Sequence, residues 1–183
     1  KQIALEHGIP VLQPEDINTI SSIEAISAYQ PDMLVTVAYG SKLKKAVRET
    51  AEFGAINLHP SLLPQLRGAA PIPFALWNGM LQTGITIFKL TARMDAGPIY
   101  LKKPYFIFPG ETATDLSDRM AYIGSKLLAD FLADFFTNPY EPELQDESQA
   151  TYCRKLEKGD GLLNWCKSVA DLCCQIRALA LVP

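Results

Sequence analysis

The chain has 183 residues, of which 48% are hydrophobic, and carries a formal net charge of −3 at pH 7. This length allows one domain with a sizeable core and excludes two full domains, and the composition is ordinary for a soluble globular protein. No stretch approaches the ~20 consecutive apolar residues of a membrane-spanning helix, and no signal-peptide pattern opens the chain. Because the sequence begins at Lys1 without an initiator Met and ends in apolar residues, we expect a fragment of a longer protein.

Apolar runs alternate with stripes at helical spacing along the chain. In chain order, we expect a helix over residues 2–7, a strand over 9–12, a helix over 17–26, a strand over 32–38, a helix over 42–48, a strand over 55–58, a helix over 74–77, strands over 84–90 and 99–108, a helix over 112–136 and a last helix over 165–179. Asp16 and Ser41 can cap the helices that follow them, and Thr112 with Asp115 can form a capping box. The run over 32–38 is typical of a strand covered on both faces. The alternation predicts an α/β domain with a largely parallel sheet.

The four cysteines all lie in the last part of the chain, at Cys153, Cys166, Cys173 and Cys174. None belongs to a C-x-x-C pair, and both histidines are distant in sequence. A zinc site and a disulfide framework are therefore disfavoured, and we expect reduced thiols that pack as small apolar side chains in a reducing compartment.

Asn57 and His59 lie two residues apart where Pro60 ends the predicted strand over 55–58. On an extended strand, residues i and i+2 point to the same face, so the amide and the imidazole are expected to point together. A donor amide beside a group that titrates near neutrality, at the carboxyl end of a strand, suits acyl or proton transfer. The structural alternative is an imidazole satisfied by backbone carbonyls.

Asp95 lies in a loop with Gly97 and Pro98, between two predicted strands. If those strands neighbour the strand that carries His59, the carboxylate can orient the imidazole ring and raise its pKa. The alternative is a turn aspartate that caps its own loop.

Three motifs are distinctive: Asn57-x-His59 followed by Pro-Ser-Leu-Leu-Pro64, Arg67-Gly-Ala-Ala-Pro-Ile72, and Met94-Asp95-x-Gly97. Together they resemble the 10-formyltetrahydrofolate-dependent formyltransferases. The similarity extends along the whole chain, through residues 8–14, 37–40 and 145–152. This resemblance implies a Rossmann-like α/β fold, here truncated, in which helices flank a mostly parallel sheet.

The resemblance also implies roles for the matching residues. Asn57 would hold the formyl oxygen and stabilise the oxyanion, and His59 would manage the proton of the attacking amine or polarise the formyl group. Asp95 would tune His59 and organise water. Two turns would line the folate pocket, namely Val37, Ala38, Tyr39 and Gly40, and Ser61, Leu62, Leu63 and Pro64. On residue type alone, simple loop packing is the favoured explanation for Leu62 and Leu63.

The segment Arg67–Ile72 is more typical of family members that formylate an aminoacyl-tRNA. The implied function is therefore formyl transfer from 10-formyltetrahydrofolate to the α-amino group of methionyl-initiator-tRNA, which supports translation initiation. The alternatives are a glycinamide ribonucleotide or sugar-nucleotide formyltransferase, and a non-catalytic folate-binding fragment. We expect no metal, no membrane partner, a monomer, and a bacterial cytoplasmic or mitochondrial-matrix location.

The same resemblance divides the chain and exposes departures from the family pattern. Residues 1–138 would be a partial catalytic domain without the family's N-terminal strands, 139–160 a linker, and 161–183 the partial start of a C-terminal domain. The family's C-terminal β-barrel would be missing, so the main tRNA contacts would lie outside this chain. Ala96 replaces the usual threonine, which removes a hydroxyl near the site. Lysines replace the usual proline near position 44, and the resulting basic cluster is more simply a solvated helix face than an RNA contact.

Overall fold

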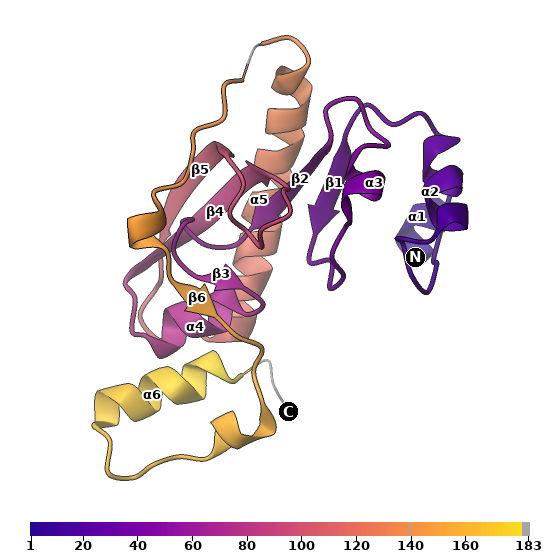
Figure 1. The fold of residues 1–183 in the computed structure, drawn as a ribbon. Helices are drawn as coiled ribbons and strands as arrows, with labels where there is room; N and C mark the ends of the chain where they lie inside the picture. Colours follow the sequence, from indigo (N-terminus) through magenta and orange to yellow (C-terminus); the bar gives the residue numbers. More distant parts are fainter. Residues whose placement is uncertain (139, 181–183) are drawn as a thin grey trace.

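The computed structural model describes residues 1–138 and 140–180. Its main sheet has the strand order β1-β2-β4-β5 (Figure 1). These strands are β1 (Leu34–Val37), β2 (Ala55–His59), β4 (Gln82–Lys89) and β5 (Ile99–Phe106). A second, two-stranded sheet pairs β3 (Arg67–Gly68) with β6 (Tyr152–Cys153) in parallel.

The strand directions only partly follow the sequence-based expectation. The α/β class is confirmed, and β1 and β2 pair in parallel as predicted. In contrast, β4 runs antiparallel to both β2 and β5. The connection between β4 and β5 spans only residues 90–98, whereas a parallel crossover needs about a dozen residues or more, so these two strands form a hairpin.

Helices flank the main sheet, and the longest of them covers one face. The helices are α1 (Gln2–Glu6), α2 (Ile20–Ser27), α3 (Lys45–Arg48), α4 (Pro71–Trp77), α5 (Ala113–Phe135) and α6 (Val169–Ala178), with short 3-10 turns at Glu147–Gln149 and Lys158–Gly161. The predicted capping box at the start of α5 is confirmed. Asp115 N donates to Thr112 Oγ1 over 3.3 Å, and Thr112 N donates to Asp115 Oδ2 over 2.9 Å.

The core lies between α5 and the sheet. Ile56 and Leu58 of β2 are buried in two adjoining clusters that include Phe131 and Met120 of α5. Gly124 of α5 allows this close packing, because a Cβ atom there would lie 3.3 Å from the Leu58 side chain. Since side chains alternate along a strand, the residues between and after these two point to the opposite face of the sheet.

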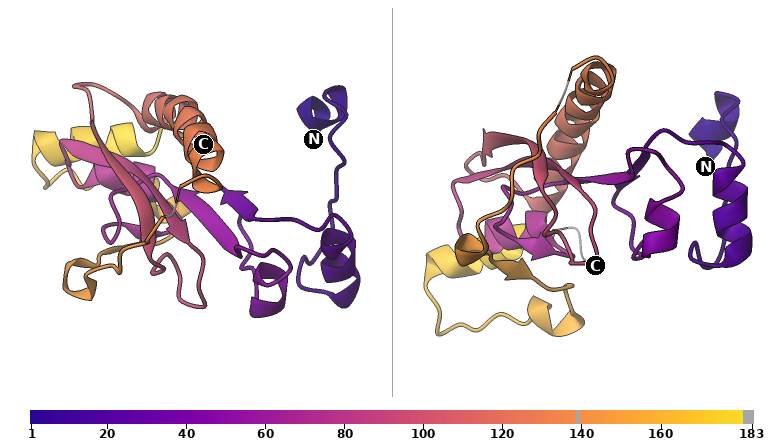
Figure 2. Two further views of the ribbon diagram at one scale, coloured as in Figure 1. Left: turned by 90° about the horizontal axis from the view of Figure 1, so that it is seen from above. Right: turned by 45° about the horizontal axis from the view of Figure 1, so that its top comes forward.

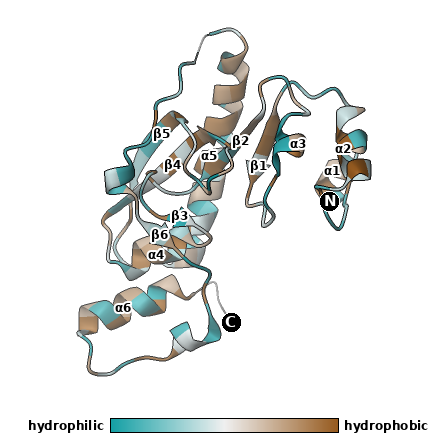
Figure 3. Ribbon diagram, viewed as in Figure 1, coloured by the Kyte–Doolittle hydropathy of each residue, from teal (hydrophilic) through white to brown (hydrophobic). Residues whose placement is uncertain are grey.

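The N-terminal region lies to one side of the sheet and connects to it through β1 (Figure 2). The strand predicted over residues 9–12 does not form, since no described strand lies beside it to supply hydrogen bonds. β1 was expected to be covered on both faces, yet Val35 and Val37 are 39% and 53% exposed. This expectation is wrong because β1 is an edge strand without a described layer over that face, although the strand is strongly apolar (Figure 3).

Several helix starts differ from the predictions. Thr19 rather than Asp16 caps α2, because Asp16 Oδ1 instead accepts the backbone N–H of Asn18 over 2.8 Å. The helix expected directly after Ser41 begins only at α3. In contrast, α4 begins earlier than predicted, because Pro71 and Pro73 lie in its first turn. Backbone N–H groups in the first turn have no partner within the helix, so proline, which lacks this group, is tolerated there.

The C-terminal part packs against the body of the molecule. α6 lies beside α4 (Figure 1), and it is shorter than the predicted helix because Ser168 caps it. All four cysteines are free thiols, and only Cys153 is buried. The predicted boundary residue 139 and residues 181–183 of the predicted last segment lie outside the described residues. Among the described helices, none is long and apolar enough to cross a membrane.

Candidate active site

The end of β2 places an amide and an imidazole on the same face of the sheet. β2 ends at His59, and Asn57 and His59 both point away from α5. His59 is 4% exposed, whereas Asn57 is half-buried. No described residue hydrogen-bonds the Asn57 side chain, so its amide is available to a carbonyl oxygen.

The imidazole of His59 is fixed by three neighbours. Its Nε2 atom lies 2.9 Å from the Leu66 carbonyl oxygen, its Nδ1 atom lies 4.0 Å from Asp95 Oδ2, and Phe88 packs edge-on against the ring. Because a carbonyl oxygen only accepts, Nε2 carries the proton in the neutral ring. The lone pair of Nδ1 then faces the side where Asp95 lies.

Burial lowers the pKa of His59, while the Asp95 carboxylate and the Leu66 carbonyl act to raise it. The sequence correctly predicted the direction in which Asp95 acts. The net shift of the His59 pKa is nevertheless downward, because loss of solvent around the ring outweighs the carboxylate. A neutral imidazole with a free Nδ1 lone pair is the form suited to accept a proton.

Asp95 comes from the β4–β5 hairpin loop and is held on both sides. Its backbone has φ 47°, which is uncommon for a residue other than glycine. Its Oδ2 atom accepts the backbone N–H of Gly68 over 2.8 Å. Gly97 allows the tight turn, because a Cβ atom there would lie 1.7 Å from the Lys89 carbonyl oxygen. The Asp95 carboxylate therefore bonds a distant strand rather than capping its own loop.

The turn after His59 is held by hydrogen bonds within itself and to β4. Ser61 Oγ donates to the Gln65 carbonyl over 2.6 Å, and Leu63 N donates to Thr86 Oγ1 over 3.2 Å. Ser61, Leu63 and Pro64 are buried, and Leu62 lies across Gly84 of β4. The side chains of this predicted folate-lining turn thus pack within the protein, and the turn itself lies directly beside the site.

The other predicted folate-lining turn is more open. Val37 pairs with Leu58 in the β1–β2 register, so residues 38–40 follow at the same sheet edge as His59. Tyr39 is 47% exposed, and Ala38 and Gly40 are exposed as well. Residues 37–40 therefore present accessible apolar surface next to the strand end.

A buried guanidinium beside the site was not predicted from the sequence. Arg67 of β3 is fully buried, and its guanidinium donates to Gln145 Oε1, to both Glu147 carboxylate oxygens and to Tyr152 Oη. Thr151 from the same segment accepts the Leu66 backbone N–H over 2.8 Å. The predicted polar linker thus packs on the active-site turn. In the sequence, only the resemblance of residues 145–152 to the family pattern pointed to this contact. Local patterns could not indicate it, because Arg67 and its partners are about 80 positions apart.

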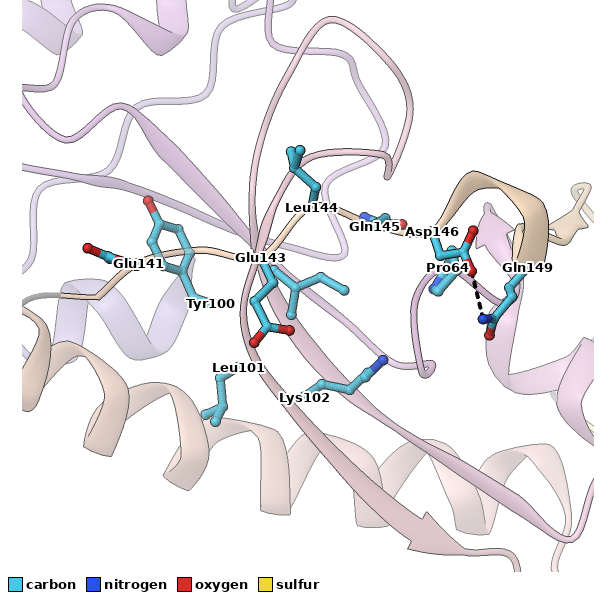
Figure 4. Close-up of a pocket in the computed structure, with 11 residues that line it drawn as sticks. Pro64, Tyr100, Leu101, Lys102, Glu141, Glu143, Leu144, Gln145, Asp146 and Gln149 are labelled. Atoms are coloured by element: carbon cyan, nitrogen blue, oxygen red, sulfur yellow. Dashed lines mark hydrogen bonds between the residues drawn. The ribbon is translucent and has the colours of Figure 1, made fainter.

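A cavity lies next to this site rather than in it. It has a volume of about 460 Å³ and lies between β5 and residues 141–149 (Figure 4). Tyr100 and Lys102 line one side, and Glu143 and Asp146 line the other. His59 and Asn57 are not among its walls. Within the described residues, no group of three or more His, Cys, Asp or Glu side chains is arranged to hold a metal ion.

Comparison with known proteins connects this geometry to one family. The pattern of the family described as formyl transferase matches residues 4–132. A methionyl-tRNA formyltransferase of Trichlorobacter lovleyi is 43% identical over the whole chain, and one of Bacillus subtilis is 39% identical over 98% of it. The chain spans 58% and 56% of the length of these two relatives.

Solved structures share the fold at lower identity. A sugar N-formyltransferase from Shewanella has a TM-score of 0.79 and 23% identity, and the match covers 97% of this chain and 70% of that one. HypX from Aquifex aeolicus, solved with tetrahydrofolic acid, has a TM-score of 0.75 and 17% identity, with coverage of 88% and 28%.

Proposed function

The chain belongs to the formyl transferase family, and on that basis we propose that the protein transfers the formyl group of 10-formyltetrahydrofolate to the α-amino group of methionyl-initiator-tRNA. The observation that carries this proposal is the placement of Asn57, His59 and Asp95 together at the end of β2. The proposed formyl acceptor is inferred from the relatives, which are named methionyl-tRNA formyltransferases and are 38–45% identical to this chain. Such a reaction in a protein with bacterial relatives would take place in the cytoplasm.

The proposed reaction assigns one task to each of the three side chains. The amine nitrogen attacks the formyl carbon and forms a C–N bond, and the Asn57 amide donates to the oxyanion that develops. Loss of one such donor typically costs about 10²–10³ in rate. His59 Nδ1 accepts the proton that the attacking amine loses, which is typically worth about 10²–10⁴, and the Asp95 carboxylate stabilises the imidazolium that results. The bond from the formyl carbon to N10 then breaks, and N10 of tetrahydrofolate takes up a proton.

The turn Val37–Gly40 supports a folate co-substrate. A pterin ring is flat and partly apolar, and this turn offers exposed Val37 and Tyr39 side chains together with open backbone at the correct sheet edge. Ser61–Pro64 would line the same pocket with the backbone of the turn, since the side chains of the turn are largely buried. These residues would bind and orient the folate so that its formyl group meets Asn57.

A sugar-nucleotide acceptor is the main competing reading, because several structural neighbours are sugar N-formyltransferases. Their identity to this chain is below 25%, so they support the fold and not the acceptor. Two more candidates are a glycinamide ribonucleotide acceptor and a non-catalytic folate-binding role.

The acceptor is tested by direct comparison. The protein is incubated with 10-formyltetrahydrofolate and, in parallel, with methionyl-initiator-tRNA, glycinamide ribonucleotide or an amino-sugar nucleotide, and the formylated products are quantified. We expect formylmethionyl-tRNA alone. Formylation of either nucleotide without the tRNA product would overturn the proposed acceptor. Folate binding without any product would support the non-catalytic role.

A further inference from the structure

The side-chain amide of Gln145 uses its full hydrogen-bonding capacity at the candidate active site. Its Oε1 atom accepts Arg67 Nε over 3.1 Å and Arg67 Nη2 over 2.7 Å. Its Nε2 atom donates to the backbone carbonyls of Asp95 and Gly97 over 2.9 and 2.7 Å. A carboxamide offers two donors and two acceptor lone pairs, so each has a partner here.

Through these four hydrogen bonds, Gln145 contacts both segments that are joined by the hydrogen bond between Gly68 and Asp95. Gly68 N donates to Asp95 Oδ2, and Gly68 directly follows Arg67 on β3. Gln145 therefore holds the residue before the donor on one side and the backbone of the acceptor residue on the other. Because Asp95 has an uncommon positive φ, its loop needs such external contacts to keep this conformation.

Arg67, which binds the Gln145 amide oxygen, is itself held by further contacts. Arg67 is fully buried, and Glu147 binds its guanidinium over 3.0 and 3.1 Å. Glu147 also pairs with the exposed Arg93 on the hairpin loop. Gln145 thus bonds the buried Arg67 guanidinium at one end and the Asp95 loop at the other. The length of the glutamine side chain therefore sets the distance between them.

We propose that Gln145 is a positioning residue that holds the Asp95 carboxylate beside His59. Its catalytic consequence rests on the proposed formyl transfer. Only glutamine combines the required reach with both donors and acceptors. Glutamate has the same length and still accepts from Arg67, but it places an oxygen against the carbonyls of Asp95 and Gly97. An asparagine at this position would be one methylene shorter and could not span the same groups.

Two substitutions separate positioning from a purely structural role. Gln145→Glu keeps the contact with Arg67 and removes the bonds to the Asp95 loop, whereas the similarly shaped Gln145→Met removes both. Gln149→Glu is the matched control, since Gln149 is exposed in the same segment and its side chain bonds only Asp146 among the described residues. The measurements are kcat and KM for formylation of methionyl-tRNA, and the hydrogen-exchange rate of the Gly68 amide by NMR.

We expect Gln145→Glu to lower kcat by about 10- to 100-fold with KM changed less than about threefold, because displacement of a catalytic group by ~1 Å can cost this much. The Gly68 amide should exchange at least about tenfold faster, since its acceptor is no longer held. Gln145→Met should behave alike, and Gln149→Glu should match the wild type in both measurements.

Wild-type kcat and Gly68 exchange in Gln145→Glu would overturn the inference and leave Gln145 only a partner of Arg67. Either variant carries the test alone if the other fails to fold. The amide measurement also separates this inference from the proposed function. If the wild type formylates no aminoacyl-tRNA, the proposed function fails, while Gly68 exchange still decides whether Gln145 holds Asp95.

Discussion

His59 Nδ1 and Asp95 Oδ2 lie 4.0 Å apart, which is too far for a direct hydrogen bond and close enough for the carboxylate to stabilise the ring once it is protonated. In the neutral ring both atoms are acceptors, because the Leu66 carbonyl binds the proton on Nε2. The gap therefore suits a hydrogen-bond donor that contacts both atoms. In the proposed reaction, this hydrogen-bond donor is the amine that receives the formyl group, or a water molecule that carries the amine proton.

Asn57→Ala should lower kcat for formyl transfer by about 10²–10³, because it removes the donor to the developing oxyanion. The melting temperature should remain close to that of the wild type, since the Asn57 amide bonds no described residue. Steady-state kinetics and a thermal melt on the same sample check both statements. A large fall in stability with unchanged kcat would make Asn57 a structural residue.

The pH dependence should follow the buried imidazole. Burial lowers the pKa of His59, so the unfolded chain binds a proton there more tightly than the folded protein does. The stability that His59 contributes is therefore present above its ordinary pKa of about 6.5 and is lost as the pH falls through the lower folded value. The activity should fall over the same acidic range, because protonated His59 cannot accept a proton.

NMR titration of the His59 ring measures this pKa directly, with the ring of exposed His7 as a spectral reference. Asp95→Asn should lower the pKa of His59 further, since it removes a neighbouring negative charge. A pKa for His59 above about 6.5 in the wild type would contradict the dominance of burial.

Arg67→Met should destabilise the protein by about 1–3 kcal/mol, because it leaves the Gln145 amide oxygen and neighbouring groups without their buried donor. Glu147→Gln should cost clearly less, since the Glu147 side chain is 47% exposed and water can solvate what the substitution leaves unpaired. Urea denaturation of both variants measures the free energies of unfolding. Equal and small losses would indicate that the buried guanidinium contributes little to stability.

Arg67 and Arg93 also lower the pKa of Glu147 to about 2 from an ordinary 4.5. A depressed carboxylate pKa means that the contribution of this pairing is present above pH 4.5 and is lost as the pH falls towards 2. The difference in acid stability between Glu147→Gln and the wild type should therefore disappear at the acidic end of this range. A constant difference across it would contradict the pairing.

The sequence predicted those parts of the site that depend on local periodicity. Asn57 and His59 share a face because strand side chains alternate, and the position of Pro60 marked the strand end. Asp95 needed one further condition, that its hairpin neighbours β2, and the observed order β2-β4-β5 satisfies it.

The remaining features depend on tertiary contacts that leave no local pattern. Arg67 and Gln145 are 78 positions apart, and nothing in either surrounding sequence indicates that one guanidinium is buried or that one amide makes four hydrogen bonds. Desolvation of His59 likewise depends on the turn that folds over it. The apolar run of β1 predicted a strand correctly, but its cover depends on neighbouring elements rather than on the run itself.

The most direct test of the central claim is single-turnover formylation of methionyl-initiator-tRNA by the wild type and by His59→Ala, with folate binding measured on the same preparations. Loss of the base should lower the rate by about 10²–10⁴ while folate binding changes little, because in the proposed reaction His59 acts on the transferred proton rather than on the folate ring. An unchanged formylation rate in His59→Ala would contradict the assignment of the β2 end as the active site.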